Sequence, residues 1–407
     1  MSSPPPIDPV AVRPRLHPAW LILGIVLVAI NLRPAIAGFG PLLAQIQREF
    51  GASSGTMSLM TAIPVLCFGL LGPLAPRLAR RFGDEPVILA CVALIAAGGW
   101  LRAGASLGTI LAGTVTLGAG IAALNVLLPG FVKRRFPAHP GLMMGVFTMT
   151  LVGGAALGAG LAVPLRDAAG GDWRASIGAW SLLALMGLLT WLPVLFDRRP
   201  AAARGPHRRE ALWRDAVAWR LTVFMGLQSL LFFAWLTWLP RLFLDHGLDV
   251  ATSGWMLAVA NLVQIPVALG VPVLAGRMAD QRPLALAVGA VTVVSLLGLL
   301  VAPMAAPLAW VMLLGVSGGA TISLALSLIV LRARDDHQVA SLSGMAQGLG
   351  YLMAASGPFV FGWLYDRTHR WEASLGLLVA CALFMSVAAY GASRPGCAGQ
   401  PPAADGT

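Results

Sequence analysis

Residues 63–86, IPVLCFGLLGPLAPRLARRFGDEP, decide the fold, because they join the end of an apolar run to a Gly/Pro-rich stretch and a basic turn. A second version, IPVALGVPVLAGRMADQRP, occupies residues 265–283. Both open on Ile-Pro-Val, and both end in a turn that carries arginines. Two such copies in register predict a chain built from two similar halves.

The composition around these copies is that of a membrane protein. The chain has 407 residues, of which 57% are hydrophobic and 11% charged. Soluble globular proteins carry roughly 45–50% apolar and about 25% charged residues. This excess of apolar residues argues against a soluble enzyme and excludes a disordered chain. The net charge of +11 therefore indicates arginine-rich cytoplasmic loops, and no nucleic-acid partner is expected.

Apolar stretches long enough to cross a bilayer, bounded by charged residues, Pro or Gly, occur twelve times. They lie at about 18–45, 54–79, 85–105, 107–132, 141–166, 173–196, 217–245, 251–275, 283–303, 307–331, 338–365 and 372–393. They predict five parts: an N-terminal tail (1–17), a six-helix bundle (18–196), a linker (197–216), a second six-helix bundle (217–393) and a disordered C-terminal tail (394–407).

The basic residues predict the orientation of this chain. If the N-terminus is cytoplasmic, 20 of the 28 basic residues fall at cytoplasmic segments and seven fall outside. The positive-inside rule then predicts a multi-pass protein of the inner or plasma membrane with both termini in the cytoplasm. One basic residue remains, Arg33, in the middle of the first span.

Parallel repeats of six spans are the plan of major facilitator transporters. The turn GPLAPRLARR (72–81) resembles the loop signature of that superfamily, G-x-L-a-D-R-x-G-R-R. Pro76 replaces the acidic residue of the signature and Ala79 replaces its second Gly, whereas the second copy keeps an acid at Asp280. The resemblance implies an all-α integral membrane protein with twelve transmembrane helices in two pseudo-symmetric six-helix bundles.

Finer matches extend over both halves. Asn31-Leu32-Arg33-Pro34 is similar to the NLRP motif of the cyanate and nitroimidazole transporter branch (CynX/NimT type). Further short matches to that branch lie at 40–43, 64–69, 74–83, 125–129, 228–232 and 237–240. The branch implies transport of small anionic or compact polar molecules by alternating access.

Arg33 is the main candidate for substrate contact. A guanidinium at the centre of a span costs roughly 2.5–3.5 kcal/mol on insertion scales, so it must face protein or water. No Asp or Glu lies deep inside any predicted span, and an unpaired guanidinium fork suits a carboxylate, cyanate or a similar anion. Pro34 weakens the helix hydrogen bonding beside it. Alternatively, Arg33 is structural and is held by amides such as Asn31 or Gln228.

The other candidates are neutral polar and aromatic residues on predicted cavity-lining spans. Alternatively, the amides hold helices together and the aromatic rings anchor the membrane interface. The predicted substrate-binding residues are Arg33, Asn31, Gln228, Asn261, Gln264, Gln347, Trp235 and Tyr351.

A second set is predicted to act in gating or structure. In the family, residues of the cytoplasmic turns latch the two halves together, although solvated positive charge is the alternative. Asn125 is expected to support the kink at Pro129. The glycines that crowd the fifth and eleventh spans are expected to be packing surfaces. The gating and structural set is Pro34, Asn125, Arg77, Arg81, Arg277 and Asp280.

The sequence offers no evident proton carrier. All six histidines fall in loops or tails, and Thr114 stands where the proton-linked signature of the family has an Arg. No HExxH motif or pair of membrane carboxylates indicates an enzyme, a metal site or a cofactor. The sequence therefore predicts a monomeric secondary active or facilitative transporter of a small anionic or compact polar solute, cyanate-like or carboxylate-like. The alternative is efflux of drug-like or heteroaromatic compounds such as nitroimidazoles.

Overall fold

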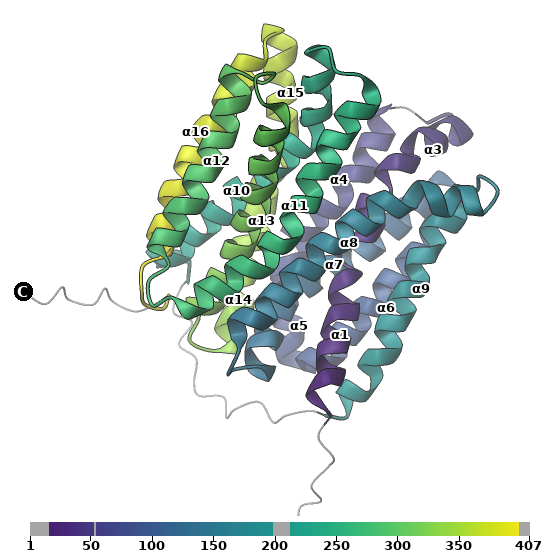
Figure 1. Ribbon diagram of the computed structural model, residues 1–407. Coiled ribbons are helices and arrows are strands. Elements are labelled where there is room, and N and C mark those ends of the chain that lie inside the picture. The colour runs from purple at the N-terminus through teal and green to yellow at the C-terminus, as the bar shows by residue number, and fades with distance from the viewer. Residues whose placement is uncertain (1–15, 53, 198–211, 399–407) are drawn as a thin grey trace, which may run out of the picture.

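The structure is a computed structural model that describes residues 16–52, 54–197 and 212–398. Throughout these residues the regular elements are helices, and no strand occurs among them. The predicted N-terminal tail, linker and C-terminal tail lie largely outside the described residues. The helices run roughly side by side along one axis (Figure 1).

The first half contains twelve helical segments. They are α1 (Pro18–Ile30), α2 (Pro34–Ala37), η1 (Gly40–Leu42), α3 (Leu43–Phe50), α4 (Ser54–Leu71), η2 (Gly72–Leu74), α5 (Ala75–Phe82), α6 (Asp84–Arg102), α7 (Leu107–Arg135), α8 (Pro140–Ala168), α9 (Trp173–Trp191) and η3 (Leu192–Leu195).

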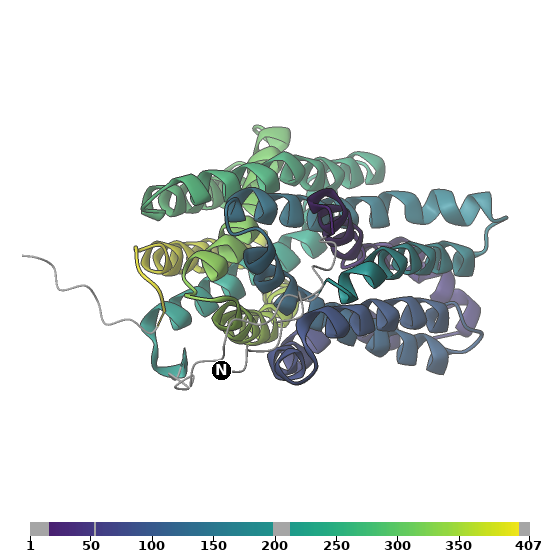
Figure 2. The ribbon, with the colours of Figure 1, turned by 90° about the horizontal axis from the view of Figure 1, so that it is seen from below.

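The second half contains eight described helical segments. They are η4 (Leu212–Arg214), α10 (Ala216–Asp245), α11 (Val250–Arg277), α12 (Arg282–Val301), α13 (Pro307–Leu331), α14 (Asp336–Ala355), α15 (Gly357–Thr368) and α16 (Trp371–Ala392). Figure 2 shows the two halves beside one another, the first in purple to blue and the second in green to yellow.

Eleven spans among the described residues are long and apolar enough to cross a membrane. They correspond to every predicted span except the eleventh, at 338–365. That segment forms α14 and α15, which meet at Ser356. It escapes the criterion because α14 carries Ser, Gln and Gly at intervals and α15 has only 12 residues.

Acidic and hydroxyl side chains mark where several helices begin. Asp215 accepts a hydrogen bond from the Ala218 amide at 2.8 Å, and Asp249 accepts one from Thr252 at 2.9 Å. Asp335 caps α14 in the same way. Such caps satisfy amides that have no partner inside the helix, so these loops fix the start of each span.

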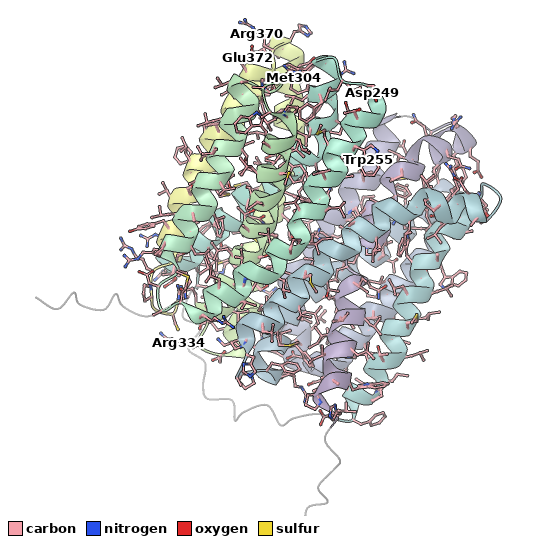
Figure 3. The ribbon with its side chains drawn as sticks, in the orientation of Figure 1. Asp249, Trp255, Met304, Arg334, Arg370 and Glu372 are labelled. Atoms are coloured by element: carbon pink, nitrogen blue, oxygen red, sulfur yellow. The ribbon has the colours of Figure 1, made fainter. Side chains whose placement is uncertain are left out.

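The bundle of helices has two ends. The termini end is where α1 begins and α16 ends, and the far end is where α3 and α15 lie (Figure 1). Charged side chains stand at both ends. Figure 3 shows Arg370 and Glu372 at the far end of the second half and Arg334 at its termini end.

The first predicted span is not one continuous helix. α1 ends at Ile30, residues 31–33 form an irregular break, and α2 is a single turn of 4 residues. Pro34 causes the break, because it has no N–H to donate to the Ile30 carbonyl. The predicted span over 18–45 is therefore present, with an interruption at residues 31–33 beside Pro34.

The segment beyond the break packs in a hydrophobic cluster of its own. Phe39, Leu42 and Ile46 pack with side chains of α7, α8 and α9, apart from the main core. α3 is tied to the start of α9 by polar contacts: Glu49 accepts hydrogen bonds from the Trp173 indole at 2.6 Å and from Arg174 at 2.5 Å. The first span thus consists of two pieces anchored in different surroundings.

Glu49 is expected to make this anchoring depend on pH. Arg174, and after it Trp173, hold the pKa of Glu49 below its ordinary value through hydrogen bonds. A carboxylate with a lowered pKa contributes its full stabilisation above the ordinary value, about pH 4.3, and loses it as the pH falls through the lowered value. Because the pair is exposed, we expect the free energy of unfolding of wild type to exceed that of Glu49→Gln by less than about 1 kcal/mol.

The measurement is the thermal melting temperature of both proteins in detergent as a function of pH. The advantage of wild type should be constant near neutral pH and should vanish in strongly acidic buffer. An advantage that persists unchanged in acid would contradict the role given to Glu49.

Glycines allow the closest helix contacts, as predicted for the fifth span. A Cβ on Gly145 of α8 would lie 2.7 Å from the Leu269 carbonyl oxygen of α11, and one on Gly158 would lie 2.5 Å from Pro34 Cα. In the eleventh span, a Cβ on Gly348 would lie 2.6 Å from Pro73. Gly153 is an exception, because nothing lies within 4 Å of its Cβ position.

Candidate functional site

Arg33 lies at the seam between the two halves. It directly precedes α2, and its Nη2 donates a hydrogen bond to the Tyr351 hydroxyl of α14 at 3.4 Å. The guanidinium carbon also lies 5.9 Å from the centre of the Phe68 ring of α4. Phe68 and Tyr351 meet edge to face, with ring centres 5.1 Å apart. Arg33, Phe68 and Tyr351 form what we call the seam site.

The charge of Arg33 is not neutralised by the protein. Among the described residues no carboxylate lies within ion-pair distance of its guanidinium. A guanidinium has five N–H donors, and one long hydrogen bond to Tyr351 uses only one of them. Arg33 is partly exposed, so donors remain accessible to a bound group. The seam site therefore offers a positive fork beside two aromatic rings.

Asn31, a predicted substrate contact, is turned away from the seam. Its side-chain amide donates to the Leu27 carbonyl at 2.6 Å and to the Leu183 carbonyl of α9 at 3.2 Å. It is 3% exposed. The break at residues 31–33 places Asn31 against α9 and Arg33 against α14, so these close neighbours have different surroundings. The structure therefore gives Asn31 the helix-joining role.

Gln347 also differs from the expected role. It lies one helical turn before Tyr351, and its amide donates to the Asn125 carbonyl of α7 at 2.9 Å and to Ser343 at 2.6 Å. Gln347 thus bridges the two halves on the termini side of the seam site. The side-chain nitrogen of Asn125 is buried without a hydrogen-bond partner.

The remaining predicted contacts gather inside the second half. Gln264 donates to Asn261 at 3.0 Å, so the two amides of α11 are paired, and Asn261 donates in turn to its own helix. A Cβ on Gly318 of α13 would lie 3.1 Å from Gln264 and 3.3 Å from Trp235. Trp235 and Gln264 therefore approach one another from two helices across the surface of a third.

A small pocket adjoins this cluster. It lies between α10, α12 and α13, and its cavity volume is only ≈ 10 Å³, about enough for one water molecule. The Gln228 amide nitrogen is used within its own helix, on Ser229 at 2.6 Å and on the Met225 carbonyl at 3.1 Å, so only its carbonyl oxygen remains as an acceptor. The polar lining residues are Gln228, Trp235, Thr292, Ser317 and Thr321. A cavity of this size holds a single water molecule, so a solute does not fit in it in this state.

The residues of the predicted latch at the termini end are not paired across the seam among the residues that this structure describes. Asp280 pairs with Arg282, two residues further along, with 2.8 Å between its carboxylate and Nε. This contact holds the pKa of Asp280 below its ordinary value. Arg77 and Arg277 are exposed, and Arg81 lies 5.2 Å from the ring of its neighbour Phe82. Asp280 is satisfied within its own turn and is not drawn across the seam.

The seam is joined instead by side chains that donate to carbonyls of the opposite half. Lys133 at the end of α7 donates to the Val330 carbonyl at 2.9 Å and to the Ala333 carbonyl, at the C-terminal end of α13. A cation is favourable there because the last carbonyls of a helix carry partial negative charge. Thr148 of α8 donates to the Ala268 carbonyl at 2.6 Å. The sequence analysis counted Lys133 only as a cytoplasmic charge.

In each half a buried arginine at the termini end joins several helices. In the first half Arg135 pairs with Glu85 at 3.2 Å and with Asp197 at 3.0 Å, and Arg134 pairs with Asp84 and Glu85. These arginines are among the 20 basic residues counted at cytoplasmic segments. The side chain of Arg135 is fully buried.

The second half repeats this arrangement with neutral partners. Arg332, at the end of α13, donates to Gln281 and to the Ala392 and Ser393 carbonyls at 3.0 and 2.8 Å. In both halves an arginine at the end of the fourth span (α7 or α13) thus joins the start of the third span (α6 or α12) to the end of the sixth. The sequence repeat therefore extends to side-chain interactions.

Comparisons with known proteins agree with this architecture. Residues 21–358 match the family model described as Major Facilitator Superfamily. The chain is 39% identical over 381 residues to a protein of Bacillus subtilis called uncharacterized transporter YycB, covering 93% of this chain and 95% of that protein. It is 36% identical over 377 residues to the 2-nitroimidazole transporter of Escherichia coli, covering 92% and 95% of the two chains.

The cyanate transport protein CynX of Escherichia coli is 28% identical over 376 residues, covering 90% of this chain and 97% of that protein. Among solved structures, the human organic anion transporter MFSD10 superposes with a TM-score of 0.74 at 16% identity, covering 92% of this chain and 100% of that chain. The proton:xylose symporter XylE gives a TM-score of 0.73 at 13% identity, covering 90% of this chain and 94% of that chain. These two likenesses concern the fold.

Proposed function

Because the chain belongs to the Major Facilitator Superfamily, we propose that it carries a small planar anion across the membrane through the seam site. As a member of that superfamily it is a multi-pass membrane transporter of small solutes and not an enzyme. The further proposal concerns which solute it carries and where that solute binds. It rests on Arg33, Phe68 and Tyr351.

One observation carries the proposal: Arg33 is a permanent cation at the seam without a carboxylate partner among the described residues. A charge kept in such a place costs free energy unless a counter-charge arrives. The two oxygens of a carboxylate match the parallel N–H groups of a guanidinium. Phe68 and Tyr351 supply flat surfaces for the rest of the molecule.

The names of the relatives fit the same chemistry. Cyanate is a small linear anion, and the nitro group of a 2-nitroimidazole presents two oxygens in one plane. A guanidinium fork can donate to either group. For this chain we propose carboxylate-like or cyanate-like anions as the substrate class.

A second candidate function is export of uncharged heteroaromatic compounds. The aromatic and polar side chains of α10 favour it, because Trp235 and Phe232 pack edge to face 5.1 Å apart and Gln228 on the same helix keeps its carbonyl oxygen as an acceptor. In that case Arg33 is structural. The two functions predict different ligands and different dependence on Arg33.

The proposed transport cycle is a rocking of the bundles 18–196 and 217–393 about the seam site. We infer that the termini end faces the cytoplasm of a bacterial inner or plasma membrane, because most basic residues lie there. Lys133 and Thr148 join the halves on that side, which supports a route from Arg33 toward the far end in this state. All residues of the site come from one chain, so a monomer suffices.

Ligand-dependent melting of the purified protein tests this proposal. A ligand that binds only the folded state at 100 times its Kd adds about 2.7 kcal/mol of stability. We expect benzoate or cyanate to raise the Tm of wild type by several degrees and to leave Arg33→Gln unchanged. 2-Nitroimidazole is the uncharged comparison. If 2-nitroimidazole stabilises both proteins equally while the anions stabilise neither, the second candidate function replaces the first.

A further inference from the structure

A second arginine is buried in the first half. Arg102 is the last residue of α6 and is only 1% exposed. Its place in the chain puts it with the charges at the outer end of the third predicted span, which does not reveal that its side chain is buried against the segment after the break in the first span.

Both contacts of the Arg102 guanidinium are with the segment that follows the break. One terminal nitrogen, Nη1, donates to the Ala35 carbonyl of α2. The guanidinium carbon lies 4.1 Å from the centre of the Phe39 ring. No described carboxylate pairs with Arg102, and its Nε is buried without a hydrogen-bond partner. The protein thus keeps a costly buried cation in contact with a single turn of helix.

The surroundings of Arg102 leave it little freedom. A Cβ on Gly113 of α7 would lie 2.6 Å from the Arg102 backbone nitrogen and 2.8 Å from its Cγ. A Cβ on Gly98 would lie 2.7 Å from the Gly113 carbonyl. The two glycines bring α6 and α7 together at this point, so the path of the arginine toward α2 is fixed by backbone on both sides.

The turn that Arg102 contacts also sets the position of Arg33. The carbonyl of Arg33 accepts hydrogen bonds from Ile36 at 3.0 Å and Ala37 at 2.9 Å. One turn of helix is unstable alone, and the break separates α2 from α1. Gly158 packs against α2 on one side, and Arg102 binds its carbonyl.

We propose that Arg102 is a positioning residue: it fixes α2 so that the Arg33 guanidinium projects between Phe68 and Tyr351. This inference rests on the proposed function, in which Arg33 binds the anion. Arg102 itself need not touch the substrate. Its hydrogen bond and its stacking on Phe39, a contact that is stronger when desolvated, act on the backbone that carries Arg33.

The first test needs no substrate. Hydrogen exchange of the amides of residues 36–38 is measured by mass spectrometry in wild type, Arg102→Gln, Arg102→Lys and the matched control Arg166→Gln. Arg166 lies toward the same end of the first half and pairs with Asp167 at 2.6 Å on the surface. We expect exchange at residues 36–38 to be about tenfold faster in Arg102→Gln and unchanged in the control. Unchanged exchange in Arg102→Gln would overturn the proposal.

The second test is a double-mutant cycle on benzoate binding. Arg102→Gln should weaken binding about tenfold in the wild-type background and should have no further effect in Arg33→Gln, because the two residues act as a unit. Arg102→Lys should recover part of the affinity. A loss of equal size in both backgrounds would show a general structural effect and overturn the proposal.

Two further outcomes concern a variant that does not fold and an anion site that fails. If Arg102→Gln does not yield folded protein, Phe39→Leu removes the ring beneath the guanidinium and should accelerate exchange at residues 36–38 by a smaller factor; no acceleration overturns the proposal. If wild type and Arg33→Gln bind benzoate alike, the proposed anion site fails. The exchange measurement then still decides whether Arg102 holds α2.

Discussion

Arg33→Gln is expected to lower kcat/KM for uptake of an anionic substrate into proteoliposomes by at least about thirtyfold. Truncating one partner of a buried, hydrogen-bonded charge pair costs roughly 2–5 kcal/mol. Glutamine is polar and of similar length but carries no charge, so it removes the attraction and leaves the break intact. The same change removes a cation that has no protein carboxylate partner among the described residues, so the protein without substrate should melt at the same temperature or higher.

Arg33→Lys separates charge from geometry. Lysine keeps the positive charge but loses the planar fork that donates two parallel hydrogen bonds. We expect a loss of roughly tenfold (about 1.4 kcal/mol), between wild type and Arg33→Gln. Arg166→Gln, whose arginine is already paired on the surface, is the control and should transport normally. Wild-type transport by both Arg33 variants would rule out the seam site as the anion site.

Gly145→Val is expected to reduce transport by about fivefold or more, because it disturbs the contact between the two halves and leaves the seam site unchanged. The added side chain would begin 2.7 Å from the Leu269 carbonyl oxygen, a backbone atom that cannot move alone. Overpacking of this kind costs about 1–3 kcal/mol. Because the clash exists only where α8 meets α11, the cost falls on the state closed at the termini end. An equilibrium between two states would shift by about 5–150-fold.

Gly153→Val on the same helix is the matched control, because nothing lies within 4 Å of its Cβ position. The measurement is maleimide labelling of Ala268→Cys in a background without the four native cysteines. Ala268 is fully buried in this state, so a forced opening should make the new thiol reactive. Slow labelling in Gly145→Val, equal to that in Gly153→Val, would mean that the seam tolerates the valine.

The sequence predicted the number of spans and the relation between the halves, because both are recorded in runs of apolar residues. It did not predict the break in the first span, since Pro34 within a helix can produce a kink or a stop depending on its neighbours. Whether the helix kinks or stops at Pro34 depends on Gly154 and Gly158, which bring α8 against residues 30 and 34. Those partners are far away in sequence, and no local pattern identifies them.

The site was predicted in part. Arg33 and Tyr351 were both named, and the structure brings them together from opposite halves. Asn31 and Gln347 were named by residue type, yet their amides bind the carbonyls of Leu183 and Asn125. A backbone carbonyl has no sequence signature, so such a partner cannot be read from the chain.

The burial of two arginines could not be predicted for a related reason. Position along the chain assigns a basic residue to one end of a span, and Arg102 and Arg135 do lie at the ends of α6 and α7. Whether the side chain then points to water or folds under the next helix depends on packing. Both arginines are buried. The sequence feature most closely connected with the burial of Arg102 is Gly113, a glycine that faces it from α7.

The hydrogen bonds across the seam are sensitive to mutation of the donor residue but not to mutation of the acceptor residue. Lys133, Thr148 and Gln347 each donate from a side chain, and each acceptor is a backbone carbonyl. Every residue type carries that carbonyl, so substitutions at Ala268 or Val330 leave the acceptor in place. Replacing a donor removes its bond. We therefore expect substitutions of the donor side chains to weaken this interface more than substitutions of the residues that supply the carbonyls.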